Sequence, residues 1–173
     1  MTETFRKTPG ATKLTCLVKR DGQEREVVIE LGTQPSEQLE GHEVTYSSVQ
    51  VPGGYRLRTI ITTPLRGEPA TRLPALLYIQ GLPCASVDRP NSPEAVDTRL
   101  IHAIAKSGYI TMRIDKPGLW DSQGPPCIEI DFETELAGYV AAAEQLKSLP
   151  QVDPDRVYIF GHSMGEVMAP YVA

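Results

Sequence analysis

The chain has 173 residues, 40% of them apolar and 23% charged, and its formal net charge is −5. Such a length and composition are typical of one globular domain with a small appendage, not of a disordered protein. The negative charge and the scattered lysines and arginines argue against nucleic acid or an anionic membrane as a partner. No stretch approaches the ~18 apolar residues of a membrane-spanning helix, so we expect no membrane partner.

The first ten residues contain no apolar segment like that of a signal peptide, which predicts a cytoplasmic protein. The chain has three cysteines, Cys16, Cys84 and Cys127, and an odd number without a secretory signal favours free thiols. One pairing stays open, because Cys84 and Cys127 both follow predicted strands that end at the same edge of a sheet. Two separate loop thiols are the interpretation that we favour for this pair.

Apolar residues alternate with polar ones on both sides of Asp21-Gly22, which predicts an antiparallel hairpin over residues 12–31. Residues 10–31 resemble the last two strands of a PDZ domain. The peptide groove of a PDZ domain needs further strands and a helix that are missing from this segment, so we expect no peptide binding. The polar residues 32–42 are typical of a linker.

The rest of the chain predicts an α/β sheet. An antiparallel pair at residues 43–51 and 55–63 flanks the turn Pro52-Gly53-Gly54. Strand and helix patterns then alternate, with strands at 73–80, 109–114 and 156–160 and helices that begin near Val96, near Phe132 and just after Ser163. This order predicts a mostly parallel, doubly wound sheet with an antiparallel N-terminal edge.

The strongest chemical signal is the motif G-x-S-x-G over Gly161-His162-Ser163-Met164-Gly165, which follows the short apolar strand at 157–160. A strand that reverses sharply into a helix needs small residues at Gly161 and Gly165, and it lifts the serine hydroxyl clear of the sheet. Ser163 is therefore the candidate nucleophile, and the Met164 N–H points at the same place. The alternative is a small-residue turn that only packs.

Two further loops are predicted to leave the same edge of the sheet. The first, Gln80-Gly81-Leu82, follows a strand, and the Leu82 N–H is a candidate second oxyanion donor, because Pro83 has no N–H. The second runs from Asp115 to Cys127, and its candidate site residues are Asp115, Gly118, Trp120 and Asp121. A plain strand-ending turn and an ordinary surface loop are the alternatives.

Taken together, these three motifs resemble the α/β-hydrolase superfamily, in particular the esterase and acyl-peptidase branch related to dienelactone hydrolases and prolyl-oligopeptidase-type enzymes. The resemblance covers residues 43–173. It implies an N-terminal hairpin and linker at 1–36, followed at 37–173 by the N-terminal half of a hydrolase domain. The implied reaction is hydrolysis of an ester, amide or peptide bond through an acyl-enzyme on Ser163, with Leu82 and Met164 as oxyanion donors.

The sequence departs from this superfamily in one important respect. The triad acid and histidine of the superfamily follow the nucleophile in the chain, which places both beyond residue 173. We expect His42, His102 and His162 to be structural or surface residues, because none is predicted to face Ser163. Since loss of a triad member typically costs on the order of 10⁴–10⁶ in rate, we expect the isolated chain to be nearly inactive.

The elbow strand at 157–160 is predicted to be an open apolar edge, which favours self-association or binding of a complementing C-terminal half. A non-catalytic truncated or interaction chain and one half of a split hydrolase therefore stay open as alternative functions. We expect no cofactor, because neither G-x-G-x-x-G nor a P-loop motif occurs. We expect no metal, because histidines and cysteines are dispersed.

Overall fold

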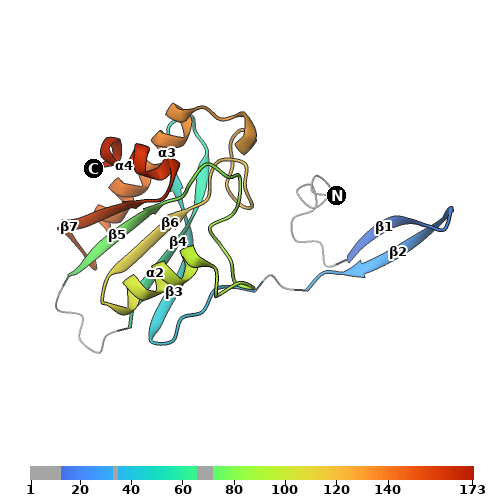
Figure 1. The fold of residues 1–173 in the computed structure, drawn as a ribbon, viewed down its shortest axis with the longest axis horizontal. Coiled ribbons are helices and arrows are strands. Elements are labelled where there is room, and N and C mark those ends of the chain that lie inside the picture. The colour runs from blue at the N-terminus through green and yellow to red at the C-terminus, as the bar shows by residue number, and fades with distance from the viewer. Residues whose placement is uncertain (1–12, 33–34, 66–71) are drawn as a thin grey trace. The chain divides into compact units, whose positions relative to one another are not determined.

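The structure is a computed structural model that describes residues 13–32, 35–65 and 72–173. The chain falls into two compact units that divide between Ser36 and Glu37 (Figure 1). Among the described residues, no helix has the length and apolar character that crossing a bilayer requires.

The first unit contains the predicted hairpin. Strands β1 (Lys13–Arg20) and β2 (Gln23–Glu30) pair in antiparallel register from Lys13 opposite Glu30 to Arg20 opposite Gln23. Asp21 and Gly22 have φ values of 53° and 79°, as a two-residue turn between twisted strands requires. The sequence prediction of this hairpin is confirmed.

The second unit contains a five-stranded mixed sheet in the order β3-β4-β6-β5-β7. Its strands are β3 (His42–Gln50), β4 (Arg56–Pro64), β5 (Leu73–Ile79), β6 (Ile110–Ile114) and β7 (Val152–Gly161). β4 is antiparallel to both β3 and β6, whereas β5 is parallel to both β6 and β7. The predicted α/β sheet with an antiparallel edge is confirmed.

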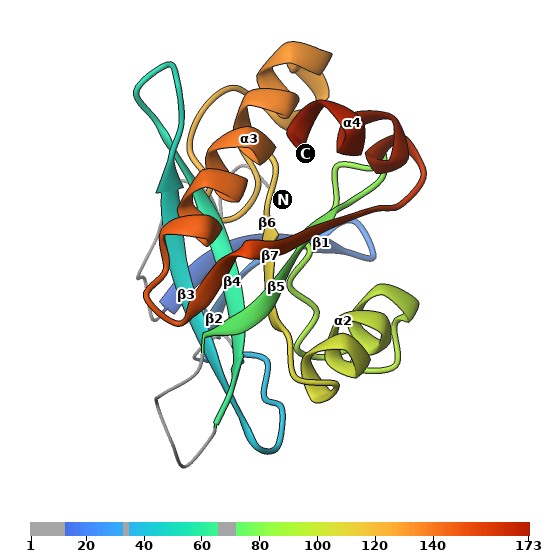
Figure 2. The same cartoon turned by 90° about the vertical axis from the view of Figure 1, so that its left-hand side faces the viewer.

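Helices cover both faces of this sheet. Helix α2 (Val96–Lys106) lies on one face, and helices α3 (Phe132–Ser148) and α4 (Met164–Val172) lie on the other (Figure 2). Side chains of β5 alternate between the two faces. Leu76 and Tyr78 pack with Ile101 of α2, whereas Leu77 and Ile79 belong to the larger core beneath α3 and α4.

Apolar spacing alone does not identify the face of helix α3 that is buried. The sequence predicts the helix, and Asp131 caps it by accepting a hydrogen bond from the Thr134 N–H at 2.8 Å. Its buried face is centred on Gly138 and Tyr139, while the apolar Val140 is 39% exposed. A Cβ on Gly138 would lie 2.7 Å from Leu57 Cδ1, so the glycine allows close approach of helix and sheet.

Candidate functional site

Ser163 occupies a strained turn between β7 and α4. Its φ of 56° and ψ of −119° lie outside the regions that a residue with a side chain normally adopts. Such a conformation costs on the order of 1–3 kcal/mol and persists only where the surrounding structure enforces it. Ser163 is exposed, and it lies at the strand-to-helix junction where the sequence predicts the nucleophile.

The two motif glycines enforce this turn, because neither has room for a side chain. A Cβ on Gly161 would lie 2.2 Å from the Gly165 carbonyl oxygen, and a Cβ on Gly165 would lie 2.3 Å from the Ile79 carbonyl oxygen. The His162 N–H donates to that same Ile79 oxygen at 3.0 Å. The start of α4 is therefore packed against the backbone at the end of β5.

Glu166 adds a carboxylate to the same turn. The Ser163 N–H donates to Glu166 Oε1 at 3.3 Å, and the Glu166 N–H donates to the Ser163 carbonyl oxygen at 2.9 Å. A negative charge in the first turn of a helix is favoured by the helix dipole. This pair of bonds holds the backbone of Ser163 from both sides.

The loop that follows β5 lies beside Ser163. A Cβ on Gly81 would lie 3.1 Å from Ser163 Cβ and 3.4 Å from the His162 carbonyl oxygen. Leu82 is 65% exposed, whereas Gln80 is buried. Within the described ranges, neither the Leu82 nor the Met164 N–H donates to another group. The structure thus brings together Gly81 and Ser163, two of the predicted site residues.

The second loop, which follows β6, carries the other predicted site residues. Asp115 is fully buried, and Gly118 makes a turn with φ of 68° in which a Cβ would lie 2.6 Å from the Pro125 carbonyl oxygen. Trp120 is 58% exposed, and its ring lies over the Arg58 guanidinium of β4 at 5.6 Å. Asp121 is exposed and lines a shallow pocket with residues of β3 and β4. Asp115 bonds to β4 and to the loop after β5, and Trp120 contacts β4, while a role of these four residues at the site stays a prediction.

None of the three histidines bonds to Ser163 in the described part of the chain. His42 Nδ1 lies 2.9 Å from the Glu40 carbonyl oxygen, and His102 Nε2 lies 3.4 Å from Glu37 Oε2. His162 is exposed, and its Nδ1 would lie 3.5 Å from a Cβ on Gly81. Likewise, the described residues contain no cluster of histidine, cysteine, aspartate or glutamate that fits a metal ion.

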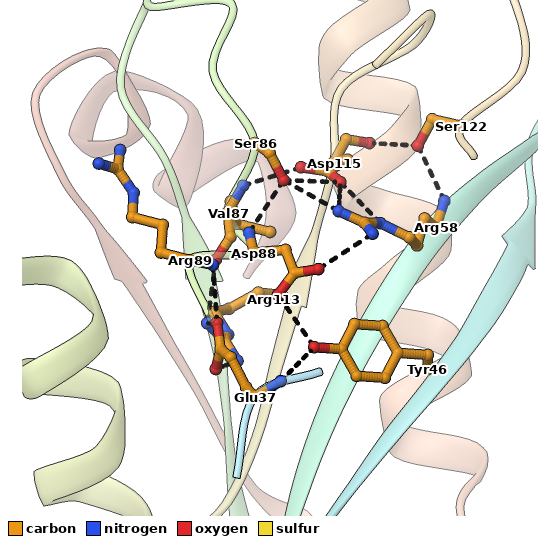
Figure 3. Close-up of polar contacts among 10 residues, drawn as sticks. All are labelled: Glu37, Tyr46, Arg58, Ser86, Val87, Asp88, Arg89, Arg113, Asp115 and Ser122. Carbon is orange, nitrogen blue, oxygen red and sulfur yellow. Dashed lines mark hydrogen bonds and ion pairs between the residues drawn. The ribbon is translucent and has the colours of Figure 1, made fainter. Parts of the chain in front are cut away.

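A buried charge network that sequence reasoning missed supports the loop after β5 (Figure 3). Asp115 accepts hydrogen bonds from Arg58 Nε at 2.8 Å, from the Val87 N–H at 2.8 Å and from Ser86 Oγ at 3.2 Å. Arg58 also donates to Asp88 Oδ2 at 3.1 Å. Burial raises the pKa of Asp88, and the hydrogen bond from Tyr46 and the charge of Arg58 only partly offset it. Burial likewise raises the pKa of Tyr46 to about 12.

A second buried pair joins Glu37 to Arg113 of β6. Arg113 donates to Glu37 Oε2 at 2.7 Å and to the Val87 carbonyl oxygen at 3.0 Å. Burial alone would raise the pKa of Glu37, but the hydrogen bonds and charge of Arg113 outweigh it and hold the pKa below its ordinary value. Burial lowers the pKa of the neighbouring His102, and the nearby Glu37 carboxylate only partly offsets this.

Lys116 is the third missed residue, and it lies directly after Asp115 at the end of β6. Its Nζ donates to the carbonyl oxygens of Gly81 and Leu82 and forms an ion pair with Glu135 of α3. For Arg58 and Arg113 the signal was in the sequence, because a charge inside an otherwise apolar strand must have a partner, although the sequence did not identify that partner. Lys116 follows its strand and carried no such signal.

Cys84 and Cys127 form a disulfide with a Cα–Cα distance of 5.8 Å, which corrects the expectation of free thiols for this pair. The bond joins the loop after β5 to the short 3₁₀ helix η1 (Cys127–Glu129). The spacing of 43 residues gave no direct signal, because the contact depends on both loops leaving the same sheet edge. Disulfides persist mainly in oxidising compartments, and the cytoplasmic location stays a prediction.

We expect the unreduced chain to show one thiol in denaturant, that of Cys16, and three after reduction. Replacing Cys127 with serine should lower the free energy of unfolding by about 2–4 kcal/mol, because it releases a long loop in the unfolded chain. A thiol titration and urea unfolding measure both quantities, with Cys16→Ser as the control. Three thiols in the unreduced denatured protein would contradict the pairing.

Comparison with known proteins gives local sequence matches and broad structural ones. No family model matches the chain. It is 32% identical over 68 residues to the quorum-quenching protein AidA of Acinetobacter baumannii, and 25% identical over 113 residues to the esterase EstD of Thermotoga maritima. These matches cover 39% and 65% of this chain but only 22% and 26% of the relatives, so the chain spans about a quarter of their length.

Solved structures match most of the chain. A hypothetical protein from Pseudomonas aeruginosa superposes with a TM-score of 0.66 at 20% identity, over 83% of this chain and 43% of that protein. The α/β-hydrolase GrgF from a Penicillium species superposes with a TM-score of 0.59 at 18% identity, over 75% and 41% of the two chains. At sequence identities this low, the matches show only that the arrangement of helices and strands is similar.

Proposed function

This chain has the α/β-hydrolase fold, and on that premise we propose that it carries the nucleophile of a serine hydrolase acting through an acyl-enzyme on Ser163. The observation that carries the proposal is the backbone of Ser163, with φ of 56° and ψ of −119° at an exposed strand-to-helix turn. A nucleophile must stand clear of the sheet, and a strained turn with an exposed serine gives it that placement.

The surrounding groups suit attack on a carbonyl carbon. Ser163 Oγ would form the new bond, and the carbonyl oxygen would become an oxyanion that the N–H groups of Leu82 and Met164 stabilise. Collapse of this intermediate releases the alcohol or amine, which takes up the serine proton, and water then hydrolyses the acyl-enzyme to the acid. We favour an ester over an amide or peptide substrate, because a relative with which the chain shares 25% identity is named an esterase.

The proton acceptor is the missing part of this reaction. Of the described residues, no imidazole bonds to Ser163, so we propose that the acid and the histidine come from polypeptide outside these 173 residues. The isolated chain would then be nearly inactive, since loss of the base typically costs on the order of 10⁴–10⁶ in rate.

Labelling with a fluorophosphonate tests the proposal, because this reagent phosphonylates activated serines. The isolated chain should be labelled slowly at Ser163, and added imidazole should accelerate labelling by standing in for the missing base. Ser163→Ala should abolish the signal. Ser107→Ala is the matched control, since Ser107 is an exposed serine whose hydroxyl donates to the Ile104 carbonyl oxygen at the end of α2.

Absence of labelling at Ser163, even with imidazole, would refute the nucleophile. Rapid labelling without imidazole would support the nucleophile and contradict the inactivity of the isolated chain. Mass spectrometry of the labelled peptide distinguishes these outcomes from non-specific reaction.

A second candidate function is association through the edge of the sheet. β7 is the last strand of the sheet, and its Tyr158 and Phe160 are 49% and 38% exposed. An open edge with apolar side chains favours pairing with a further strand. We propose that a complementing polypeptide segment or a second copy of the chain binds residues 157–160, as in one half of a split hydrolase.

A further inference from the structure

A buried ammonium group, that of Lys116, binds backbone carbonyl groups of the loop after β5. Lys116 Nζ donates to the Gly81 carbonyl oxygen at 2.7 Å and to the Leu82 carbonyl oxygen at 3.0 Å. Its side chain is 1% exposed. Lys116 therefore contacts the backbone of the loop and is shielded from any substrate at Ser163.

Because a peptide bond is planar, a contact that holds the Gly81 carbonyl oxygen also sets the direction of the Leu82 N–H. The Gly81 carbonyl and the Leu82 N–H belong to one planar peptide unit, and the described residues contain no cis peptide bond. In a trans peptide the N–H points away from the carbonyl oxygen. By holding the Gly81 oxygen on one side, Lys116 therefore directs the Leu82 N–H to the opposite side.

The same contact strengthens the donor. A hydrogen bond accepted by a peptide carbonyl polarises the amide, which makes its N–H a better donor, by about 10–30% per bond. Here the bond comes from an ammonium group in a buried site, where electrostatic effects are screened less than in water. The second bond, to Leu82, fixes the next peptide unit, whose nitrogen belongs to Pro83 and donates nothing.

A residue of helix α3 also holds the Lys116 side chain in place. Its Nζ lies 2.9 Å from Glu135 Oε1 in α3, and the glutamate side chain is 8% exposed. Asp115, the preceding residue, binds the Val87 N–H further along the same loop, and the Cys84–Cys127 disulfide joins that loop to η1. The loop beside Ser163 is thus anchored at its start, its middle and its far end.

We infer that Lys116 is a positioning residue that orients and polarises the Leu82 N–H as an oxyanion donor, with Glu135 holding the lysine in place. This inference rests on the proposed function of Ser163. Its geometric part, the fixing of the Gly81-Leu82 peptide, stands independently of any reaction.

The test compares Lys116→Met with Glu135→Gln, which leaves both carbonyl contacts of the lysine in place. In imidazole-assisted phosphonylation of Ser163, Lys116→Met should lower the rate constant by about 10–100-fold, since misplacement of a site group by ~1 Å can cost 10². The final extent of labelling should match that of the unmodified chain. Glu135→Gln should lower the rate constant less.

Circular dichroism of each variant separates positioning from stability. Reversible partial unfolding would lower the observed rate constant only in proportion to the folded fraction, whereas a misdirected donor lowers it in a variant that is fully folded. Should Lys116→Met fail to fold, Lys116→Met/Glu135→Leu removes both buried charges together and leaves the two carbonyls unheld. An unchanged rate constant in a fully folded variant would overturn the inference.

Hydrogen exchange keeps the two proposals distinguishable. In Lys116→Met, amide exchange in peptides covering residues 80–87 should accelerate, while exchange in β3 and β4 should not. If the unmodified chain is never phosphonylated, the proposed function fails and exchange still decides the anchoring of the loop. Unchanged exchange in residues 80–87 would refute that anchoring.

Discussion

Replacing Gly165 with alanine should lower the free energy of unfolding by about 3 kcal/mol or more, at the upper end for an overpacked site. The added Cβ would lie 2.3 Å from the Ile79 carbonyl oxygen and 3.0 Å from Ile79 Cγ2. Ile79 ends β5, which is paired on both sides by β6 and β7, so its backbone has little freedom to move. Urea unfolding followed by circular dichroism measures the change.

Gly32→Ala is the matched control, since a Cβ there meets nothing within 4 Å and the backbone does not have a positive φ. We expect its unfolding midpoint to stay unchanged. Equal midpoints for Gly165→Ala and the unmodified chain would show that α4 does not pack against β5 as described. Loss of Ser163 labelling in Gly165→Ala should accompany the loss of stability, because the strained turn depends on this contact.

The second large effect concerns Asp115, the buried acceptor of the charge network. Asp115→Ala should destabilise the protein by about 3–5 kcal/mol, because it leaves the Arg58 guanidinium buried without its main partner. The Val87 N–H would also lose its acceptor. Thermal and urea unfolding measure the change, and the loop from Gly81 to Arg89 should be the first segment to exchange its amide hydrogens.

Asp153→Ala is the control for this variant. Asp153 forms an exposed ion pair with Arg156 at 2.6 Å, so its loss should leave the unfolding midpoint essentially unchanged. The double variant Arg58→Met/Asp115→Ala should be more stable than the two single changes predict by addition, because it removes the orphaned charge. Strict additivity would contradict a direct coupling of Arg58 and Asp115.

Features that depend on neighbouring residues could be predicted from the sequence. The Asp21-Gly22 turn, the alternation of strands and helices, and the strand-to-helix position of Ser163 follow from local patterns, and the structure has each of them. The prediction that the turn needs small residues at the two motif glycines is also correct. Their missing side chains leave room for backbone contacts that any Cβ would block.

The support beneath the site could not be predicted in this way. Arg58 and Asp115 are 57 residues apart, and Glu37 and Arg113 are 76 residues apart, so no local pattern links either pair. The same holds for Lys116, whose partners lie on the loop after β5 and on α3. Each partner choice depends on the order of strands in the sheet, which brings β4, β5 and β6 together.

Trp120 gives the chain a built-in optical probe. It is the single tryptophan of the sequence, so excitation near the red edge of protein absorption reports on one loop alone. Its indole is mostly exposed and lies over a guanidinium group that belongs to the buried network. A change in emission during unfolding should therefore report when Arg58 leaves its place, independently of the helices that dominate the dichroism signal.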